Sequence, residues 1–179
     1  GHTLTLDGTG PATNLTGVIS GSGALIKNDS GTATLSGANT YSGGTTLNSG
    51  TLPANHAAAL GTAGVTLAGG TLASTNGSTI ANSLALTGAA GLANITTSGT
   101  LTQTGSQTLT MAGATQSGAM NLSSTNTGQT LTVQVDSGTS AINGVIANGG
   151  TGAGSLTKTG TGTLTLGGAN TYTGATTIN

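Results

Sequence analysis

The chain has 179 residues, of which 3% are charged, and a formal net charge of −1 at pH 7; it contains 34 Gly and, by direct count, 40 Thr, but no Phe, Trp or Cys. Without cysteine it has no disulfide framework and no thiolate ligand or nucleophile, and two basic residues cannot form the patch that nucleic-acid binding needs. The lack of aromatic side chains argues against a wide globular core, whereas the mean hydropathy of +0.13 and the low net charge argue against intrinsic disorder.

Short runs in which Leu, Ile or Val alternates with Thr or another small residue recur along the whole chain. Alternation with a period of two is typical of a half-buried strand, with the aliphatic side chain inward and Thr outward. The expected strands, in chain order, are residues 3–6, 32–35, 65–67, 83–86, 100–102, 107–111, 130–135 and 163–166. Residues 57–60 are the one stretch that we expect to form a helical turn.

A long internal repeat is the strongest pattern in the sequence. Residues 25–48 match residues 156–179 at 15 of 24 positions, in an alignment that places Lys27 on Lys158. Similarity extends upstream, so that residues 1–48 match 128–179, with extra residues in the glycine-rich stretch 147–155, which we expect to be a loop. We therefore predict that residues 1–179 are a single all-β segment of a longer repetitive protein, a right-handed parallel β-helix (β-solenoid) of roughly eight or nine turns.

Both copies share the pattern L-x-K-x-x-x-G-T-x-T-L-x-G-A-N-T-Y-x-G-x-T-T-[LI]-N, and SGTL follows the first copy at residues 49–52. This pattern resembles the autotransporter-associated β-strand repeat of passenger regions in bacterial autotransporters. The resemblance implies a secreted or cell-surface β-helix, exported through an outer-membrane barrel at the C-terminal end of a larger precursor. Our main hypothesis is a structural, non-enzymatic stalk or display segment of an autotransporter adhesin that supports export and surface presentation.

Few side chains could carry chemistry. The acids are Asp7, Asp29 and Asp136, and the chain has no Glu or Arg. We expect Asp29 to pair with Lys27, which lies on the same strand face, and Asp7 and Asp136 to cap backbone amides in comparable turns. We predict no catalytic residue, no cofactor-binding residue, no metal-ligating residue and no cofactor.

The basic and imidazole side chains have structural interpretations. Lys27 and Lys158 occupy the same repeat position, where we expect a solubilising group that discourages lateral strand pairing; a charged contact with a partner is the alternative. His2 and His56 lack a nearby acid and serine arrangement that would suggest a catalytic triad.

Asn and Tyr recur at the turn of each repeat. We expect Asn39 and Asn170 to adopt left-handed backbone geometry or to form side-chain ladders between turns. We expect the rings of Tyr41 and Tyr172 to cover the corner while their hydroxyls stay in water.

Two other classes of function remain open. Pairs of Thr two residues apart would face outward, and stacked on one flat sheet they would resemble the ice-binding faces of β-solenoid antifreeze proteins, so a solenoid that binds ice or a glycan is the first alternative. The pairs are Thr3/Thr5, Thr32/Thr34, Thr100/Thr102, Thr108/Thr110, Thr130/Thr132 and Thr163/Thr165. A polysaccharide-active β-helix enzyme is the second alternative, and it requires two carboxyls to converge beside a cleft.

The expected partners follow from the same features. They are a host surface or glycan ligand, or a second copy stacked on the unpaired strand edges of the terminal turns. We expect no nucleic acid and, because no apolar run approaches about 18 residues, no membrane span in the chain.

Overall fold

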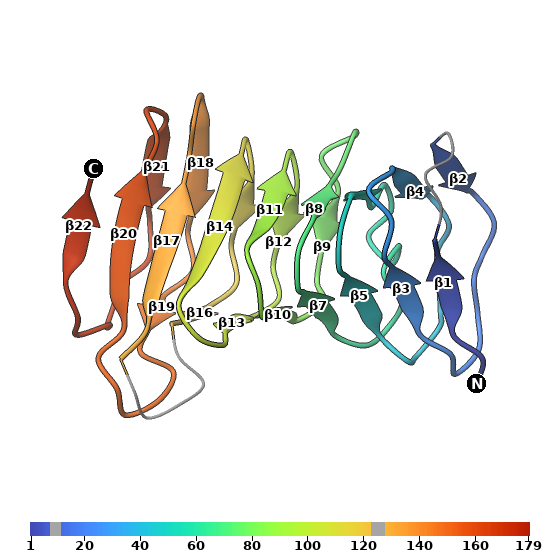
Figure 1. The fold of residues 1–179 in the computed structure, drawn as a ribbon, viewed down its shortest axis with the longest axis horizontal. Helices are drawn as coiled ribbons and strands as arrows, with labels where there is room; N and C mark the ends of the chain where they lie inside the picture. Colours follow the sequence, from blue (N-terminus) through green and yellow to red (C-terminus); the bar gives the residue numbers. More distant parts are fainter. Residues whose placement is uncertain (8–11, 123–127) are drawn as a thin grey trace.

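The computed structural model describes residues 1–7, 12–122 and 128–179, which form 22 short strands and no helix. Neighbouring strands pair in parallel and follow one another along the long axis, with the two chain termini at opposite ends (Figure 1). The molecule is therefore a parallel β-solenoid of about eight turns, as the repeat predicts. Among the described residues, no helix has the length and apolarity needed to cross a membrane.

Three sheets run along the solenoid. Sheet I contains eight strands in spatial order: β1 (Leu4–Leu6), β3 (Leu25–Lys27), β5 (Thr45–Leu47), β7 (Val65–Leu67), β10 (Leu84–Leu86), β13 (Leu101–Gln103), β16 (Met120–Asn121) and β19 (Ile146–Ala147). Sheet II contains β6 (Thr51–Pro53), β8 (Thr71–Ala73), β11 (Ala90–Ala93), β14 (Gln107–Ala112), β17 (Thr130–Gln134), β20 (Ser155–Thr159) and β22 (Thr176–Ile178). Sheet III contains β9 (Thr79–Ile80), β12 (Thr96–Thr97), β15 (Thr115–Gln116), β18 (Thr139–Ile142) and β21 (Thr163–Leu166).

The paired strands β2 (Thr13–Leu15) and β4 (Ala33–Leu35) extend sheet II toward the N-terminal end. Two isolated bridges, Thr32 to Thr51 and Leu35 to Ala54, join β4 to the turn that contains β6. Each turn thus visits sheet I, then sheet II, then sheet III or the loop that replaces it.

The core is a set of aliphatic columns between the sheets. Leu47, Leu67 and Leu86 are partners in register on sheet I, and each is fully buried. Burying a Leu side chain stabilises the fold by about 1.5–3 kcal/mol, and each turn buries its leucines against the turns on either side. The narrow interior therefore needs few large side chains, which explains the scarcity of aromatic residues.

The strands predicted from alternation all occur, with ends that differ by at most one residue, and residues 148–154 form a loop as expected. Residues 57–60, where we expect a helical turn, form a hydrogen-bonded turn that is not part of a helix. In it the Ala59 N–H donates to the His56 carbonyl at 2.9 Å.

Glycines stack at the corner that follows sheet III. A Cβ on Gly118 would lie 2.1 Å from the carbonyl oxygen of Gly99, and one on Gly144 would lie 1.9 Å from that of Gly118. Gly168 stands in the same relation to Gly144. Successive turns approach so closely at this corner that no side chain fits between them, which accounts for part of the high glycine content.

The two copies of the repeat lie on different faces of the solenoid. The first copy begins with β3 on sheet I and continues to β4 at the N-terminal extension of sheet II, whereas the second begins with β20 on sheet II and continues to β21 on sheet III. The second copy therefore starts one sheet later around the solenoid than the first copy does. The motif forms the same turn whichever face it starts on.

Candidate functional site

The repeated motif closes one complete turn on itself. In the first copy its first strand, β3, pairs with its last strand, β5, so that Leu25 and Ile26 lie beside Thr45 and Thr46. In the second copy β20 pairs with β22 in the equivalent register. Each copy therefore contains both partners of a strand pair, and it does not need another turn to form that pair.

Lys27 holds the tight turn after the first strand, and the expectation that it is a solvent-exposed group is wrong. Its side chain is fully buried, and its Nζ donates to the Asp29 carbonyl at 2.6 Å and to Asp29 Oδ1 at 2.7 Å. The reason is strand alternation, which places Lys27 on the inward face with Leu25. The expected ion pair is present, and the hydrogen bond from Lys27 lowers the pKa of Asp29 below its usual value.

Lys158 makes the matching contact in the second copy. Its Nζ donates to the Thr159 and Gly160 carbonyls at 2.8 and 2.7 Å, and its side chain is half-buried. Both lysines thus bind the carbonyl two residues further along the chain. They act on the backbone of the turn and not on the outer surface.

Two glutamines make the same kind of contact, and sequence reasoning missed them. Gln103 Nε2 donates to the Gly105 carbonyl at 2.6 Å, and Gln116 Nε2 donates to the Gly118 carbonyl at 2.9 Å. Both side chains are fully buried. A sequence pattern could have identified Gln103 and Gln116: a Lys or Gln at the end of a strand with a Gly two residues later.

The asparagines of the repeat join successive turns, but through main-chain atoms of the neighbouring turns and not through the side-chain ladder that we expected. Asn39 accepts from the Ile19 N–H at 2.8 Å through Oδ1 and donates to the Ala59 carbonyl at 2.6 Å through Nδ2. Asn170 Oδ1 accepts from the Ile146 N–H at 2.9 Å. Neither Asn39 nor Asn170 has a positive φ, so neither adopts the left-handed backbone geometry that was the other expectation. Among the described non-glycine residues, Asn94 has a positive φ.

Tyr41 is buried, and the expectation that its hydroxyl stays in water is wrong. The hydroxyl lies 2.6 Å from Thr45 Oγ1, and Thr45 Oγ1 also donates to the Leu60 carbonyl at 3.2 Å. Burial raises the pKa of the Tyr41 phenol. Tyr172 makes the same contact with Thr176 at 2.6 Å on the exposed last turn.

The remaining acids lie apart from one another along the solenoid. Asp7 follows β1, which pairs with β3, and Asp136 follows β17, which pairs with β20. The two acids therefore follow equivalent strands of the two copies, as expected, and both are exposed. The Asp136 carboxylate accepts from Gln134 Nε2 at 2.9 and 3.0 Å and not from a backbone amide as we expected. Among the described residues no cluster of three His, Cys, Asp or Glu side chains could hold a metal ion.

The two histidines have no acid partner among the described contacts. His56 Nδ1 accepts from the Ala58 N–H at 3.1 Å, which caps its own turn. His2 is exposed at the N-terminal end.

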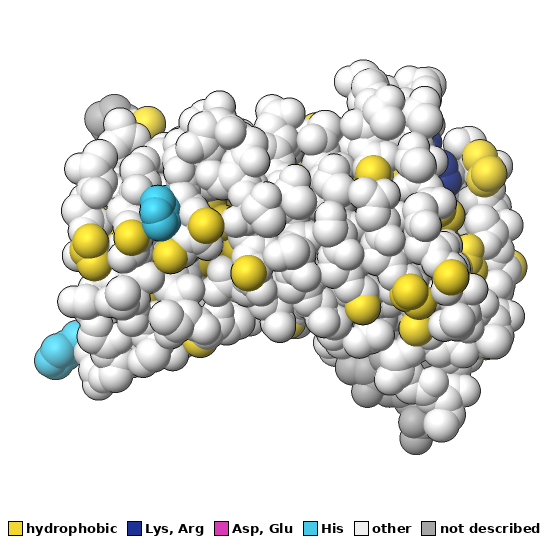
Figure 2. Space-filling view, turned by 180° about the vertical axis from the view of Figure 1, so that it is seen from behind, with side chains coloured by type: hydrophobic (Ala, Val, Ile, Leu, Met, Phe, Trp, Pro, Cys, Tyr) yellow, Lys and Arg dark blue, Asp and Glu magenta, His cyan; other side chains and the backbone are white. Residues whose placement is uncertain are grey.

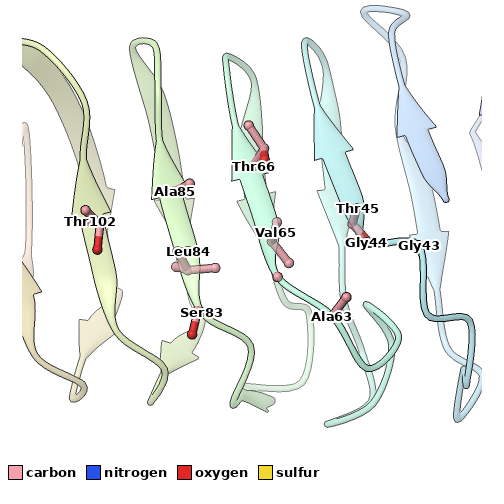
Figure 3. A pocket seen from close by; sticks show the side chains of 11 residues that line it. Gly43, Gly44, Thr45, Ala63, Val65, Thr66, Ser83, Leu84, Ala85 and Thr102 are labelled. Atoms are coloured by element: carbon pink, nitrogen blue, oxygen red, sulfur yellow. The ribbon is translucent and has the colours of Figure 1, made fainter. Parts of the chain in front are cut away.

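A shallow groove of about 390 Å³ lies beside sheet I, where the chain enters β5, β7 and β10 (Figure 3). Its lining residues are Gly43, Gly44, Thr45, Ala63, Gly64, Val65, Thr66, Ser83, Leu84, Ala85 and Thr102. These groups offer hydroxyls and main-chain atoms for hydrogen bonding. None of them is a carboxylate or an imidazole.

The chain has five residues that carry a formal charge at pH 7, and its exposed large hydrophobic residues in the described part are Leu4, Val18, Val145, Leu166 and Ile178. Figure 2 shows hydrophobic side chains in small separate groups on the face behind that of Figure 1, with a hollow along one edge. The Thr pairs point outward as expected, but they are distributed over three sheets: Thr3/Thr5 on the side of sheet I, Thr108/Thr110 on sheet II and Thr163/Thr165 on sheet III.

One family model matches the chain, the passenger-associated-transport-repeat, at residues 25–52 and 156–179. These are the self-closing turns that the lysine, asparagine and tyrosine side chains hold together. The chain fits an autotransporter passenger region with repeats. No curated protein and no solved structure matches it.

Proposed function

We propose that this passenger segment is a stiff, non-enzymatic stalk that supports export and surface presentation of a bacterial autotransporter adhesin. The observation that carries the proposal is the self-closing repeat, in which β3 pairs with β5 and β20 pairs with β22. A turn that contains its own strand pair can add to a growing rod, and each added turn buries more aliphatic surface.

The buried polar contacts support stiffness. Asn39 bonds to the turns before and after its own, and Lys27 and Tyr41 each satisfy their polar atoms inside the rod. A buried polar group that loses its hydrogen-bond partner costs about 1–3 kcal/mol. Any bend that separates these buried partners therefore costs free energy, which keeps the turns in one arrangement.

A non-enzymatic role is supported by the engagement of the polar side chains. The Asp29 carboxylate binds Lys27 and the Gly31 N–H, and the Asp136 carboxylate binds Gln134. The groove beside sheet I is lined by small and aliphatic residues. In this proposal the parent protein lies at the cell surface or is secreted, and it contacts a host surface or glycan.

Labelling of single cysteines on intact cells tests the proposal, because the chain itself contains no cysteine. Thr66 and Leu67 are neighbours in β7; Thr66 faces outward and Leu67 is fully buried. We expect a membrane-impermeant maleimide to label Thr66→Cys on intact cells of the producing organism. Leu67→Cys, the matched control, reacts after unfolding by denaturant. Labelling of Thr66→Cys that requires cell lysis contradicts surface presentation.

A further inference from the structure

Sheet II carries its longest strands side by side. β14, β17 and β20 have six, five and five residues, whereas β6 and β8 have three each. Figure 1 shows the three long strands adjacent and nearly parallel, with β22 beyond them. A long strand presents two or three side chains to the outside, so these strands form the widest outer face of the described solenoid.

The register of these strands aligns their outward side chains in columns. The columns are Thr108, Thr132, Thr157 and Thr177; Thr110, Gln134 and Thr159; and Thr130 with Ser155. Every member carries a hydroxyl except Gln134, and none is charged or purely aliphatic. We call this set the hydroxyl face.

The hydroxyl face has a fixed two-dimensional spacing. Adjacent strands lie about 4.8 Å apart, and side chains two residues apart on one strand are separated by about 6.7 Å. The side chains that alternate with the face, among them Leu109, Leu131 and Val133, are fully buried and hold the strands in place. In the described part of the chain, the hydroxyls of Thr132 and Thr157 donate to no other protein group, so they are available to solvent.

We propose that the hydroxyl face orders water into an ice-like layer and binds to ice. Each Thr hydroxyl both donates and accepts, and its methyl group sits beside it, so a regular array of Thr fixes the positions of neighbouring waters. The two spacings of the face are comparable to the oxygen repeats on the surface of an ice crystal. Ordered water therefore fits the face over its whole area without any movement of the protein.

The same features favour ice over a glycan. Small-molecule and sugar sites are concave and combine apolar or aromatic walls with a few polar groups. The hydroxyl face is the outer surface of a sheet, and neither tyrosine lies on its strands. It also has no charged member that would bind an ionic ligand. The stalk function does not require this face, so the two proposals can fail separately.

Partition into slowly growing ice tests the inference on the intact chain. We expect the chain to enter the ice well above the level of an inert soluble protein, and to shape ice crystals into facets. Thr132→Lys and Thr157→Lys place long charged side chains in the central column, and we expect each to reduce partition to the inert level. Thr66→Lys, an equally half-buried outward Thr on sheet I, is the matched control and retains partition.

Far-UV circular dichroism of all variants shows whether they keep the β-sheet spectrum of the parent. A further variant, Thr132→Val, removes the hydroxyl but keeps a β-branched side chain that favours a strand. Loss of partition in a folded Thr132→Val supports the inference. Partition of the unsubstituted chain at the inert level overturns it. Equal loss in Thr66→Lys and Thr132→Lys overturns the assignment to this face, and binding of the face to a glycan with no ice partition overturns the choice of ligand.

Discussion

The close approach of successive turns predicts opposite effects for two alanine substitutions in one glycine column. Gly37 lies at the corner after β4, where an added Cβ would meet the Gly17 carbonyl oxygen at 2.3 Å and its carbon at 2.9 Å. Gly17 occupies the corresponding corner of the preceding turn, and a Cβ there meets nothing within 4 Å. Neither residue has a positive φ.

The two substitutions share the same effect on the unfolded chain. Replacing Gly by Ala at a compatible position stabilises a protein by about 0.4–1 kcal/mol through the lower entropy of the unfolded state. Only Gly37→Ala adds a steric clash, and overpacking costs about 1–3 kcal/mol. We therefore expect Gly37→Ala to be less stable than Gly17→Ala by about 1–3 kcal/mol.

Thermal unfolding followed by far-UV circular dichroism measures this difference. For a chain of this size each 1 kcal/mol shifts Tm by about 2–4 °C, so the two variants should differ by at least about 2 °C. The turns of a solenoid can differ in stability along the rod. Because the two substitutions lie in neighbouring turns, such differences should affect both Tm values in the same way. Equal Tm values, or a higher Tm for Gly37→Ala, would refute the stacking of turns at this corner.

Three further predictions follow from the contacts. Tyr41→Phe removes a buried hydroxyl contact and should lower stability by about 1 kcal/mol, whereas Tyr172→Phe, at an exposed contact, should have little effect in the same thermal assay. The pKa of Asp29 is lower in the folded state than its unfolded value of 3.8, so the ionised carboxylate stabilises the fold at pH values above 3.8. This stabilisation is lost as the pH falls through the folded pKa. The difference in Tm between the parent and Asp29→Asn should therefore shrink as the pH is lowered from 3.8 through the folded pKa. We expect a second copy to stack on the end turns, where Val18 and Ile178 are 64% and 79% exposed. Sedimentation should then show less association for the double variant Val18→Lys with Ile178→Lys than for the parent.

Alternation of Leu and Thr predicted the architecture because each strand needs an inward aliphatic residue and an outward polar one. The strands it missed are too short to display a period of two: β9 and β12 contain two residues each. The tandem repeat then selected a solenoid among the all-β folds, since each turn buries its face on its neighbours.

The orientation of Lys27 was within reach of the sequence. The alternation of Leu25 and Lys27 already placed both on one face, but the general preference of charged residues for water outweighed that signal. The Asp29 carbonyl and carboxylate, which make burial of the lysine favourable, become visible as partners once the turn is folded. The contact between Tyr41 and Thr45 depends on the same kind of local folding.

The rotation of the second repeat could not be read from the sequence, because the turn length varies along the chain. A short turn separates Leu84 of β10 from its partner Leu101 of β13, whereas a much longer one separates Met120 of β16 from its partner Ile146 of β19. The separation of the two copies in sequence therefore fixes neither the number of turns between them nor the face on which the second copy begins. The columns of the hydroxyl face depend on this register as well.

Insertion of one turn tests the solenoid stalk most directly. Residues 45–64 span one full turn, because Thr45 pairs with Val65. Spin labels on Thr5→Cys in β1 and Thr102→Cys in β13 lie five strand spacings apart, about 24 Å by backbone separation. Duplicating residues 45–64 should lengthen this distance by about 4.8 Å with the same narrow distribution, whereas a flexible Gly/Ser insert of equal length at the same site should leave it unchanged. An unchanged or broad distance distribution after the duplication would contradict a rod built from stacked, self-closing turns.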